Sequence, residues 1–257
     1  LYIENFSGIP YTVEENDTLM RFGKVFQQTY TRFLDLQKAE AQAREAQIEL
    51  SLERVRARTM AMQKSDELNE VNTVIIQQIK SLQIHLFAFG IHICHVNEPI
   101  SEAWMGDPVE GYIPKVKFNH SQDPLAIKLY SGWKEGKALF VEELKGEALK
   151  EHFEYMFSLV PDRSTFDNLI APDSLVFHSA YFTHGFFVFV TQEHCEEEHS
   201  FFKRLAKVFE QTYTRFLDLQ KAEAQAREAQ IELGLERVRS RAMAMQNSDE
   251  LKELIGT

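Results

Sequence analysis

The chain has 257 residues, of which 44% are hydrophobic, as is usual for a folded globular protein, and its formal net charge is −11 at pH 7. The acidic balance disfavours a nucleic-acid surface, because phosphate binding needs clustered Lys and Arg side chains. No apolar run of about 18 residues predicts a membrane span, and two cysteines are too few for a disulfide scaffold. We therefore expect a cytoplasmic protein with no nucleic-acid partner and no membrane contact within these residues.

One stretch of sequence occurs twice and organises the chain. Residues 25–68 recur as residues 208–251. The two copies differ only at the paired positions Gln27/Glu210, Ser51/Gly234, Ala57/Ser240, Thr59/Ala242 and Lys64/Asn247. A near-identical repeat indicates an array of units. The residues between the copies are therefore expected to form one module.

The first eight residues, LYIENFSG, alternate large apolar and polar side chains over the length of a strand. When the two copies of the repeat are aligned, this segment falls on GFFVFVT at 185–191, which also has the character of a strand. We expect residues 1–8 to be the terminal strand of a preceding, truncated unit.

Residues 14–68 predict the first of two signalling helices. The candidate N-caps near its start are Asn16, Asp17 and Thr18. Gly and Pro are nearly absent as far as residue 89, so we expect one uninterrupted helix to about Leu82, on the order of 100 Å long. The second copy predicts a second such helix over 207–257.

Apolar side chains spaced by three and four residues form a seam in each copy, as in a coiled coil. In the first copy the seam consists of Ile48, Leu52, Val55, Thr59 and Met62. Its equivalents in the second copy are Ile231, Leu235, Val238 and Met245. The twelve-residue step from Leu36 to Ile48 is not a whole number of heptads, so the register must shift there. We interpret the seam as a relay surface that passes on a rotation or a shift, with a plain dimerising coiled coil as the alternative.

Residues 69–206 predict one module between the helices. Alternating side chains predict strands over 85–96, 111–119, 138–144, 174–184 and 185–191. A tight turn around His184 and Gly185 joins the last two strands. Helices are expected over 124–136, which Asp123 caps with Pro124 in the first position, and over 147–159.

The order of these elements, with KEGKALFVEEL as a short strand after the second helix and a closing hairpin before the exit helix, resembles that of the GAF sensor domain. The flanking words QTYTRFLDLQKAEAQAREAQIEL and LERVRARTMAMQKSDEL are similar to the connecting helices of bacterial sensor histidine kinases. The resemblance implies an α+β fold, a GAF-like antiparallel sheet with helices, flanked by long N- and C-terminal coiled-coil helices. It also implies a cytoplasmic array whose helices link adjacent sensor and output domains.

Signatures of catalysis and of known GAF ligands do not occur in the sequence. No histidine lies in an H-E-x-x-T-P phosphoacceptor context, and no glycine-rich ATP loop is present. The Asn-Lys, Phe and Asp-Glu signature of cyclic-nucleotide GAF domains is not assembled, and neither Cys94 nor Cys195 lies in the context of a bilin attachment site. We predict a non-catalytic chain and no particular cofactor.

Two groups of side chains are candidates for binding. Aromatic residues that could line a pocket for a small planar ligand are Phe87, Phe89, Trp104, Phe118, Trp133 and Tyr181. The alternative is that these rings fill the core. Cys195 and His199, four residues apart at the start of the exit helix, could share a metal or haem. Because the doubled C-x-x-C spacing of strong zinc sites is missing, we predict no metal.

The sequence therefore predicts a sensory or relay module of a signal-transduction protein, of the sensor histidine kinase type, that acts as a parallel homodimer through its helices. A purely structural spacer or dimerisation module is the first alternative. A metal or haem redox sensor is the second.

Overall fold

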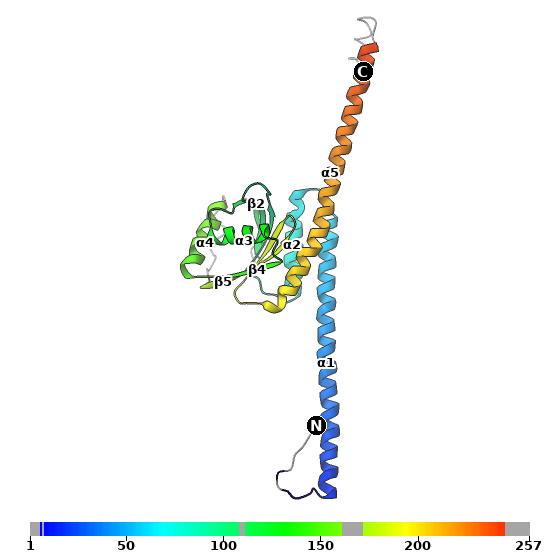
Figure 1. Cartoon of the computed structure of the whole chain (residues 1–257), viewed down its shortest axis with the longest axis vertical. Coiled ribbons are helices and arrows are strands. Elements are labelled where there is room, and N and C mark those ends of the chain that lie inside the picture. The colour runs from blue at the N-terminus through cyan, green and yellow to red at the C-terminus, as the bar shows by residue number, and fades with distance from the viewer. Residues whose placement is uncertain (1–5, 7, 108–110, 161–171, 245–257) are drawn as a thin grey trace. The chain divides into compact units, whose positions relative to one another are not determined.

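The chain divides into two compact units, Leu1–Glu53 and Arg54–Thr257. The computed structural model describes residues 6, 8–107, 111–160 and 172–244, without the side chains of residues 107, 111–114 and 244 (Figure 1). Most of the predicted strand at 1–8 lies outside these residues. Helix α1, Val13–Met60, supplies the first unit and the start of the second.

Helix α1 begins at Val13, within one residue of the predicted start, and a capping box forms at Thr12. The Thr12 hydroxyl accepts a hydrogen bond from the Glu15 backbone N–H at 3.2 Å, and the Glu15 carboxylate accepts one from the Thr12 N–H at 2.7 Å. The predicted caps Asn16, Asp17 and Thr18 lie inside the helix, so that prediction is wrong.

The prediction of one helix to Leu82 is also wrong, because the chain turns at residues 61–64. A short 3₁₀ helix η1, Ser65–Glu67, follows, and then α2, Leu68–Ser81. The Glu67 carboxylate accepts hydrogen bonds from the backbone N–H groups of Gln63 and Lys64, both at 3.0 Å. A side chain thus replaces the helical partners of these two groups and stabilises the turn.

Six antiparallel strands form one sheet in the order β3-β2-β1-β6-β5-β4. Their bounds are β1 Ala88–Cys94, β2 Ile100–Asp107, β3 Gly111–Asn119, β4 Leu139–Lys145, β5 Ser174–Phe182 and β6 Gly185–Thr191. Strand β2, with the sequence ISEAWMGD, is absent from the sequence prediction. Its two faces each mix polar and apolar residues, so it lacks the clean alternation that marks a half-buried strand.

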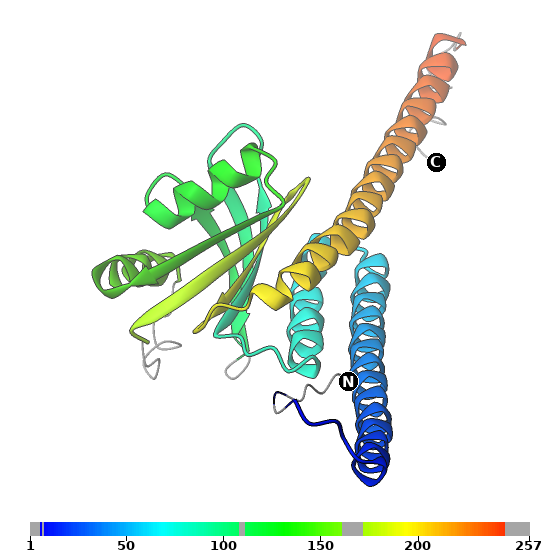
Figure 2. The same ribbon diagram turned by 60° about the horizontal axis from the view of Figure 1, so that its bottom comes forward.

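Helices cover both faces of the sheet (Figure 2). Helix α2 packs on β1 and β2, and α5, His199–Ala244, packs on β5. The opposite face is covered by α3, Pro124–Lys134, and α4, Gly146–Leu159. The fold is α+β, an antiparallel sheet with helices on its faces and a long helix at each end of the chain, as predicted.

Two local predictions in the module are confirmed. The Asp123 side chain accepts a hydrogen bond from the Ala126 N–H at 2.7 Å and caps α3, with Pro124 in its first turn. Strands β5 and β6 meet in a tight turn before Gly185, where an added Cβ atom would overlap the carbonyl oxygen of His92. That close approach explains why glycine occupies this position.

Candidate functional site

The long helix α5 is joined to the sheet by stacked aromatic rings. The Phe189 and Phe202 rings lie parallel with centroids 3.9 Å apart, and Phe209 lies 5.0 Å from both Phe182 and Phe187. Phe189, Phe202 and Phe209 have essentially no exposed surface. Burial of these three phenylalanine rings away from water is the main source of stability for this contact. The first part of the exit helix is therefore a firmly held cover of the sheet.

A buried polar chain lies at the start of the same helix. The Thr191 hydroxyl donates to the Glu193 carbonyl at 2.6 Å, so its oxygen is free to accept from His178 Nε2–H at 3.0 Å. His178 Nδ1 then accepts the Nε2–H of His199 at 2.9 Å. Burial lowers the pKa of His178 to about 4 and also lowers the pKa of His199. Neutral imidazoles thus connect β5 and β6 to α5 at neutral pH.

The entering helix is joined to the module by charged and apolar contacts. Arg58 of α1 contacts Glu67 at 2.9 Å and Glu70 at 2.7 Å, and Arg54 donates to the Gln78 side chain of α2 at 3.0 Å. Val55, Thr59 and Met62 are buried in this region, as are Leu68, Val71, Ile75 and Ile79 of α2. The end of α1 and helix α2 therefore form one packed joint.

The entering and leaving helices also meet directly. The Gln220 side chain of α5 donates a hydrogen bond to the Gln63 carbonyl, in the turn after α1, at 3.1 Å. The contact of α1 with α2 and the contact of α5 with the strands both lie on the face of the sheet that α2 and α5 cover.

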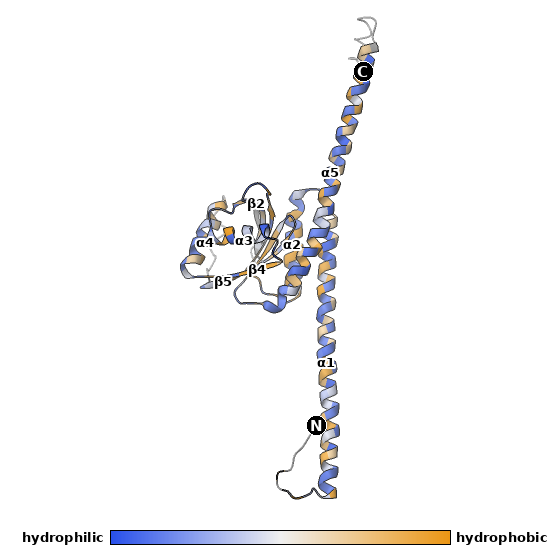
Figure 3. Cartoon of the chain, viewed as in Figure 1, coloured by the Kyte–Doolittle hydropathy of each residue, from blue (hydrophilic) through white to orange (hydrophobic). Residues whose placement is uncertain are grey.

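The two copies of the repeat bury opposite halves. Phe209 is fully buried, whereas its equivalent Phe26 is 50% exposed. Val55 is fully buried, whereas its equivalent Val238 is 53% exposed. Figure 3 shows apolar residues recurring along both α1 and α5.

The same reversal applies to the other predicted relay residues. In the first copy all of them are buried: Ile48, Leu52, Val55, Thr59 and Met62. In the second copy the described ones are exposed: Ile231, Leu235 and Val238. Met245 lies outside the described residues. Of the five buried residues of the first copy, Val55, Thr59 and Met62 lie in the second compact unit, the one that contains the sheet.

The six predicted pocket residues do not come together. Phe87, Tyr181 and Trp133 of α3 pack against the cluster between the sheet and helices α3 and α4, and Phe118 belongs to the adjoining cluster on that face. Phe89 packs on Phe187 and Phe189, under α5, and alternation along β2 places Trp104 on that second face as well. Phe89, Trp104 and Phe118 are buried and Phe87, Trp133 and Tyr181 are half-buried, but the sequence could not assign the six rings to one face of the sheet.

A hydrogen-bonded histidine chain beneath α3 escaped the sequence prediction. His120 Nδ1–H donates to the Ala126 carbonyl at 3.1 Å, so its Nε2 accepts the Ser101 hydroxyl at 2.8 Å. The Ser101 oxygen accepts His92 Nδ1–H at 3.1 Å. Burial lowers the pKa of His120 to about 4 and that of His92 well below its usual value. Ser101 has no exposed surface, so this serine–histidine pair offers no substrate an approach.

A second pair extends this polar interior. His152 Nδ1 lies 3.1 Å from the Asp123 carboxylate, which also caps α3. Burial alone would raise the pKa of Asp123, but the hydrogen bonds from His152 and from the backbone outweigh it and lower that pKa. The signal that could have revealed the pair is Asp123 itself, since a buried cap carboxylate needs a further partner.

The predicted metal pair is connected through His178. The Cys195 sulfur lies 3.5 Å from His178 Nε2, whereas His199 contacts the other nitrogen of that ring. Burial raises the pKa of the Cys195 thiol to about 11, which disfavours the thiolate that metals prefer. Among the described residues, no group of three or more His, Cys, Asp or Glu side chains is arranged to hold a metal ion.

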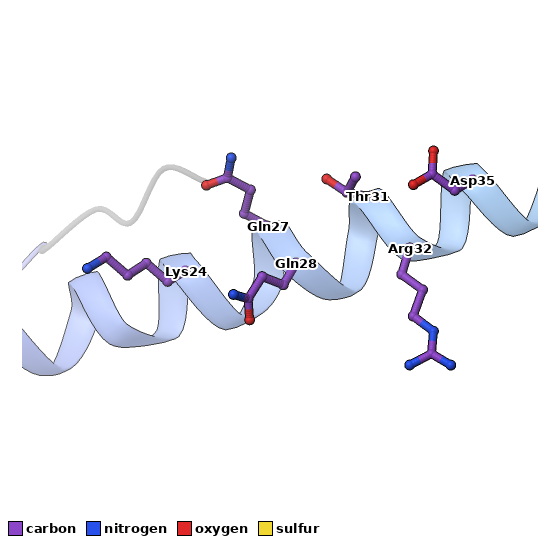
Figure 4. Close-up of a pocket in the computed structure, with 6 residues that line it drawn as sticks. All are labelled: Lys24, Gln27, Gln28, Thr31, Arg32 and Asp35. Carbon is purple, nitrogen blue, oxygen red and sulfur yellow. The ribbon is translucent and has the colours of Figure 1, made fainter.

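The described residues that line a shallow hollow on α1 all have polar side chains (Figure 4). Gln27, Thr31 and Asp35 project from one side of the helix and Arg32 from the opposite side. All four are exposed to solvent. Such a surface has neither the burial nor the convergent groups of a ligand site.

Comparison with known proteins gives one structural likeness. The chain is similar to a solved structure described as the A. Aeolicus nlh2 gaf domain in an inactive state, with 8% sequence identity and a TM-score of 0.41, over 69% of this chain and 99% of that chain. Neither a family model nor a curated protein matches the sequence. No helix in the described part of the chain is long and apolar enough to cross a membrane.

Proposed function

We propose that this chain is a non-catalytic sensory or relay module of a cytoplasmic signal-transduction protein of the sensor histidine kinase type. The proposal rests on two helix contacts on one face of the sheet, that of α1 with α2 and that of α5 with the strands. The end of α1 packs on α2, α5 packs on β5 and β6, and Gln220 links the two joints at 3.1 Å. One sheet therefore holds the entering and the leaving helix at the same time.

The relay works by a difference in affinity. A ligand or partner that binds one arrangement of the sheet and its helices better than another shifts their populations. Helices α3 and α4 cover the face opposite the two joints. Because packed interiors transmit strain rather than absorb it, a shift beneath α3 displaces the strands that carry both joints. Adjacent sensor and output domains of the same protein are the proposed partners.

Self-association is part of the proposal and needs a surface that both copies expose. Leu36 and Leu50 are exposed in the first copy, and their equivalents Leu219 and Leu233 are exposed in the second. The leucines of each pair are fourteen residues apart, which is two heptads. We assign the seam of a parallel homodimer to this stripe, since the buried residues of the first copy are already engaged.

The experiment is light scattering of the whole chain at about 100 μM, where a coiled coil of micromolar affinity is mostly paired. We expect a dimer mass, and Leu233→Asp should shift the protein towards monomer because it buries a charge in the seam. Glu232→Asp, an exposed conservative change beside it, is the matched control. A monomeric natural chain at this concentration would contradict the dimeric relay.

A structural spacer is the second candidate, and the filled aromatic interior favours it. The His92 and Phe186 rings stack with centroids 4.7 Å apart beneath α3, with Phe118 5.1 Å from His92. A spacer keeps the same helix packing whatever binds nearby. A small molecule retained through purification, detected by mass spectrometry of the denatured protein, would favour the sensor.

A further inference from the structure

The two halves of the repeat meet two different surfaces. In the second copy, the first half covers β5 and β6 through Phe209, and Tyr213 and Phe216 are buried beside it. In the first copy, the second half contacts α2, with Val55 and Thr59 buried beside Arg54 and its bond to Gln78. Neither copy has both halves covered in this chain.

The exposed halves have the same sequence as the covered ones. Residues 25–38 equal residues 208–221 except for Gln27 in place of Glu210. Glu210 uses its carboxylate to accept the Thr183 backbone N–H at 2.8 Å, and the amide oxygen of a glutamine can accept the same bond. A surface that fits the β5–β6 face once is therefore present a second time without a cover.

The sequence difference at residue 59 in the second half is also compatible with its contact. Thr59, which Ala242 replaces in the other copy, bonds only the Val55 carbonyl of its own helix at 2.9 Å. An alanine there leaves no group of α2 unsatisfied. Ile231, Leu235 and Val238 are the equivalents of the buried Ile48, Leu52 and Val55, and they are exposed.

The two halves are far enough apart to be covered together. Fifteen residues separate Phe216 from Ile231, which is roughly 22 Å along a helix. The alanine- and glutamine-rich stretch between them is exposed in both copies. One module can therefore sit on the first half and another on the second half without overlap.

We propose that each repeat is a helix with two docking faces, and that the halves left exposed here bind further units of the same kind. The first half takes the β5–β6 face of one GAF-like unit, and the second half takes the α2-type helix of the next. This assembly does not depend on signal relay or on self-association. Leu233, in the dimer stripe, lies about 160° around the helix from Leu235, in the docking face.

The test extends the natural chain by one module. In the extended protein, residues 1–251 are followed directly by a second copy of residues 69–257, so that the middle repeat has a module on each side. Hydrogen exchange of the amides at 231–238 should slow at least about tenfold relative to the natural chain. Equal exchange in the two proteins would overturn the proposal. So would an added module that stays unfolded, because the same sequence folds in the natural chain.

Two leucine variants identify the occupant of the docking face. Leu52 is 3% exposed and Leu50 is 52% exposed in the first copy, and their equivalents are Leu235 and Leu233. In the extended protein, Leu235→Asp should restore fast exchange at 231–238, whereas Leu233→Asp should leave the protection in place. Protection lost only with Leu233→Asp would mean that paired chains, rather than a docked module, cover the face, and would refute the inference. A monomeric natural chain would end the dimeric relay but leave this result unchanged.

Discussion

At the scale of single residues, buried histidines hold the sheet to its helices. His120 links Ala126 of α3 to Ser101 of β2, and His178 links Thr191 of β6 to His199 of α5. Each of these two rings accepts a hydrogen bond at one unprotonated nitrogen, so each imidazole must stay neutral. Burial secures this by lowering the pKa of both rings to about 4.

These histidines make the stability of the module depend on pH. In the unfolded chain a histidine has a pKa of about 6.5, so between pH 6.5 and pH 4 the unfolded state binds protons that the folded state does not. The free energy of unfolding should therefore be highest above pH 6.5 and fall as the pH drops towards 4. Urea unfolding at pH 7.5, 6 and 5 measures the slope.

The variant His120→Gln assigns part of that slope to one ring. It should cost about 1–2 kcal/mol at pH 7.5, because Ser101 and Ala126 lose well-placed partners. Between pH 6.5 and pH 4 it should also reduce the slope of the unfolding free energy against pH by the equivalent of about one bound proton. An unchanged slope would show that His120 is protonated in the folded state at these pH values.

Individual residues also show how far sequence reasoning reaches. Asp123 and Pro124 predicted the start of α3, because a cap acts on neighbours only a few residues away. Phe89 and Phe118 were both candidates for the lining of one pocket, yet they lie on opposite faces of the sheet. Which face a strand turns towards which helix depends on the register of pairing across the whole sheet, and no local pattern contains it.

At the scale of elements, the two copies of the repeat form the same kind of helix but bury different residues. Both copies form helix from the first residue of the repeat, as far as Met60 in the first copy and Ala244 in the second, as their composition predicts. The prediction failed where the helix ends, because KSDEL holds no Gly or Pro and the turn depends on Glu67 and Arg58. Strand β2 was missed for a related reason, since its pairing with β1 rather than its own pattern places it in the sheet.

The repeat supplies a matched pair of substitutions at this scale. Phe209→Ala should lower the free energy of unfolding by about 3–5 kcal/mol, because it leaves a cavity against Phe182 and Phe187. Phe26→Ala, the same change at the exposed equivalent, should alter it by less than about 0.5 kcal/mol. Urea unfolding followed by tryptophan fluorescence compares the two. Equal losses would mean that the first half of the first copy is also buried.

At the scale of the whole molecule, the proposed role of the repeat is that of a joint between units. The first half of the 44-residue sequence packs on the sheet and the second half packs on α2, and each of these contacts occurs once in the described chain. The sequence identified the repeat and the module between its copies. It could not show which half of each copy is covered, because the two copies are nearly identical and only tertiary packing distinguishes them.

Hydrogen exchange with mass spectrometry on the natural chain tests this joint most directly. The paired segments have almost the same intrinsic exchange rates, and the differences at Gln27/Glu210, Ser51/Gly234 and Thr59/Ala242 make their peptides distinguishable by mass. We expect 208–219 to exchange at least about tenfold more slowly than 25–36, and 48–62 more slowly than the described part of its equivalent, 231–244. Equal protection of matching halves in the two copies would contradict the account.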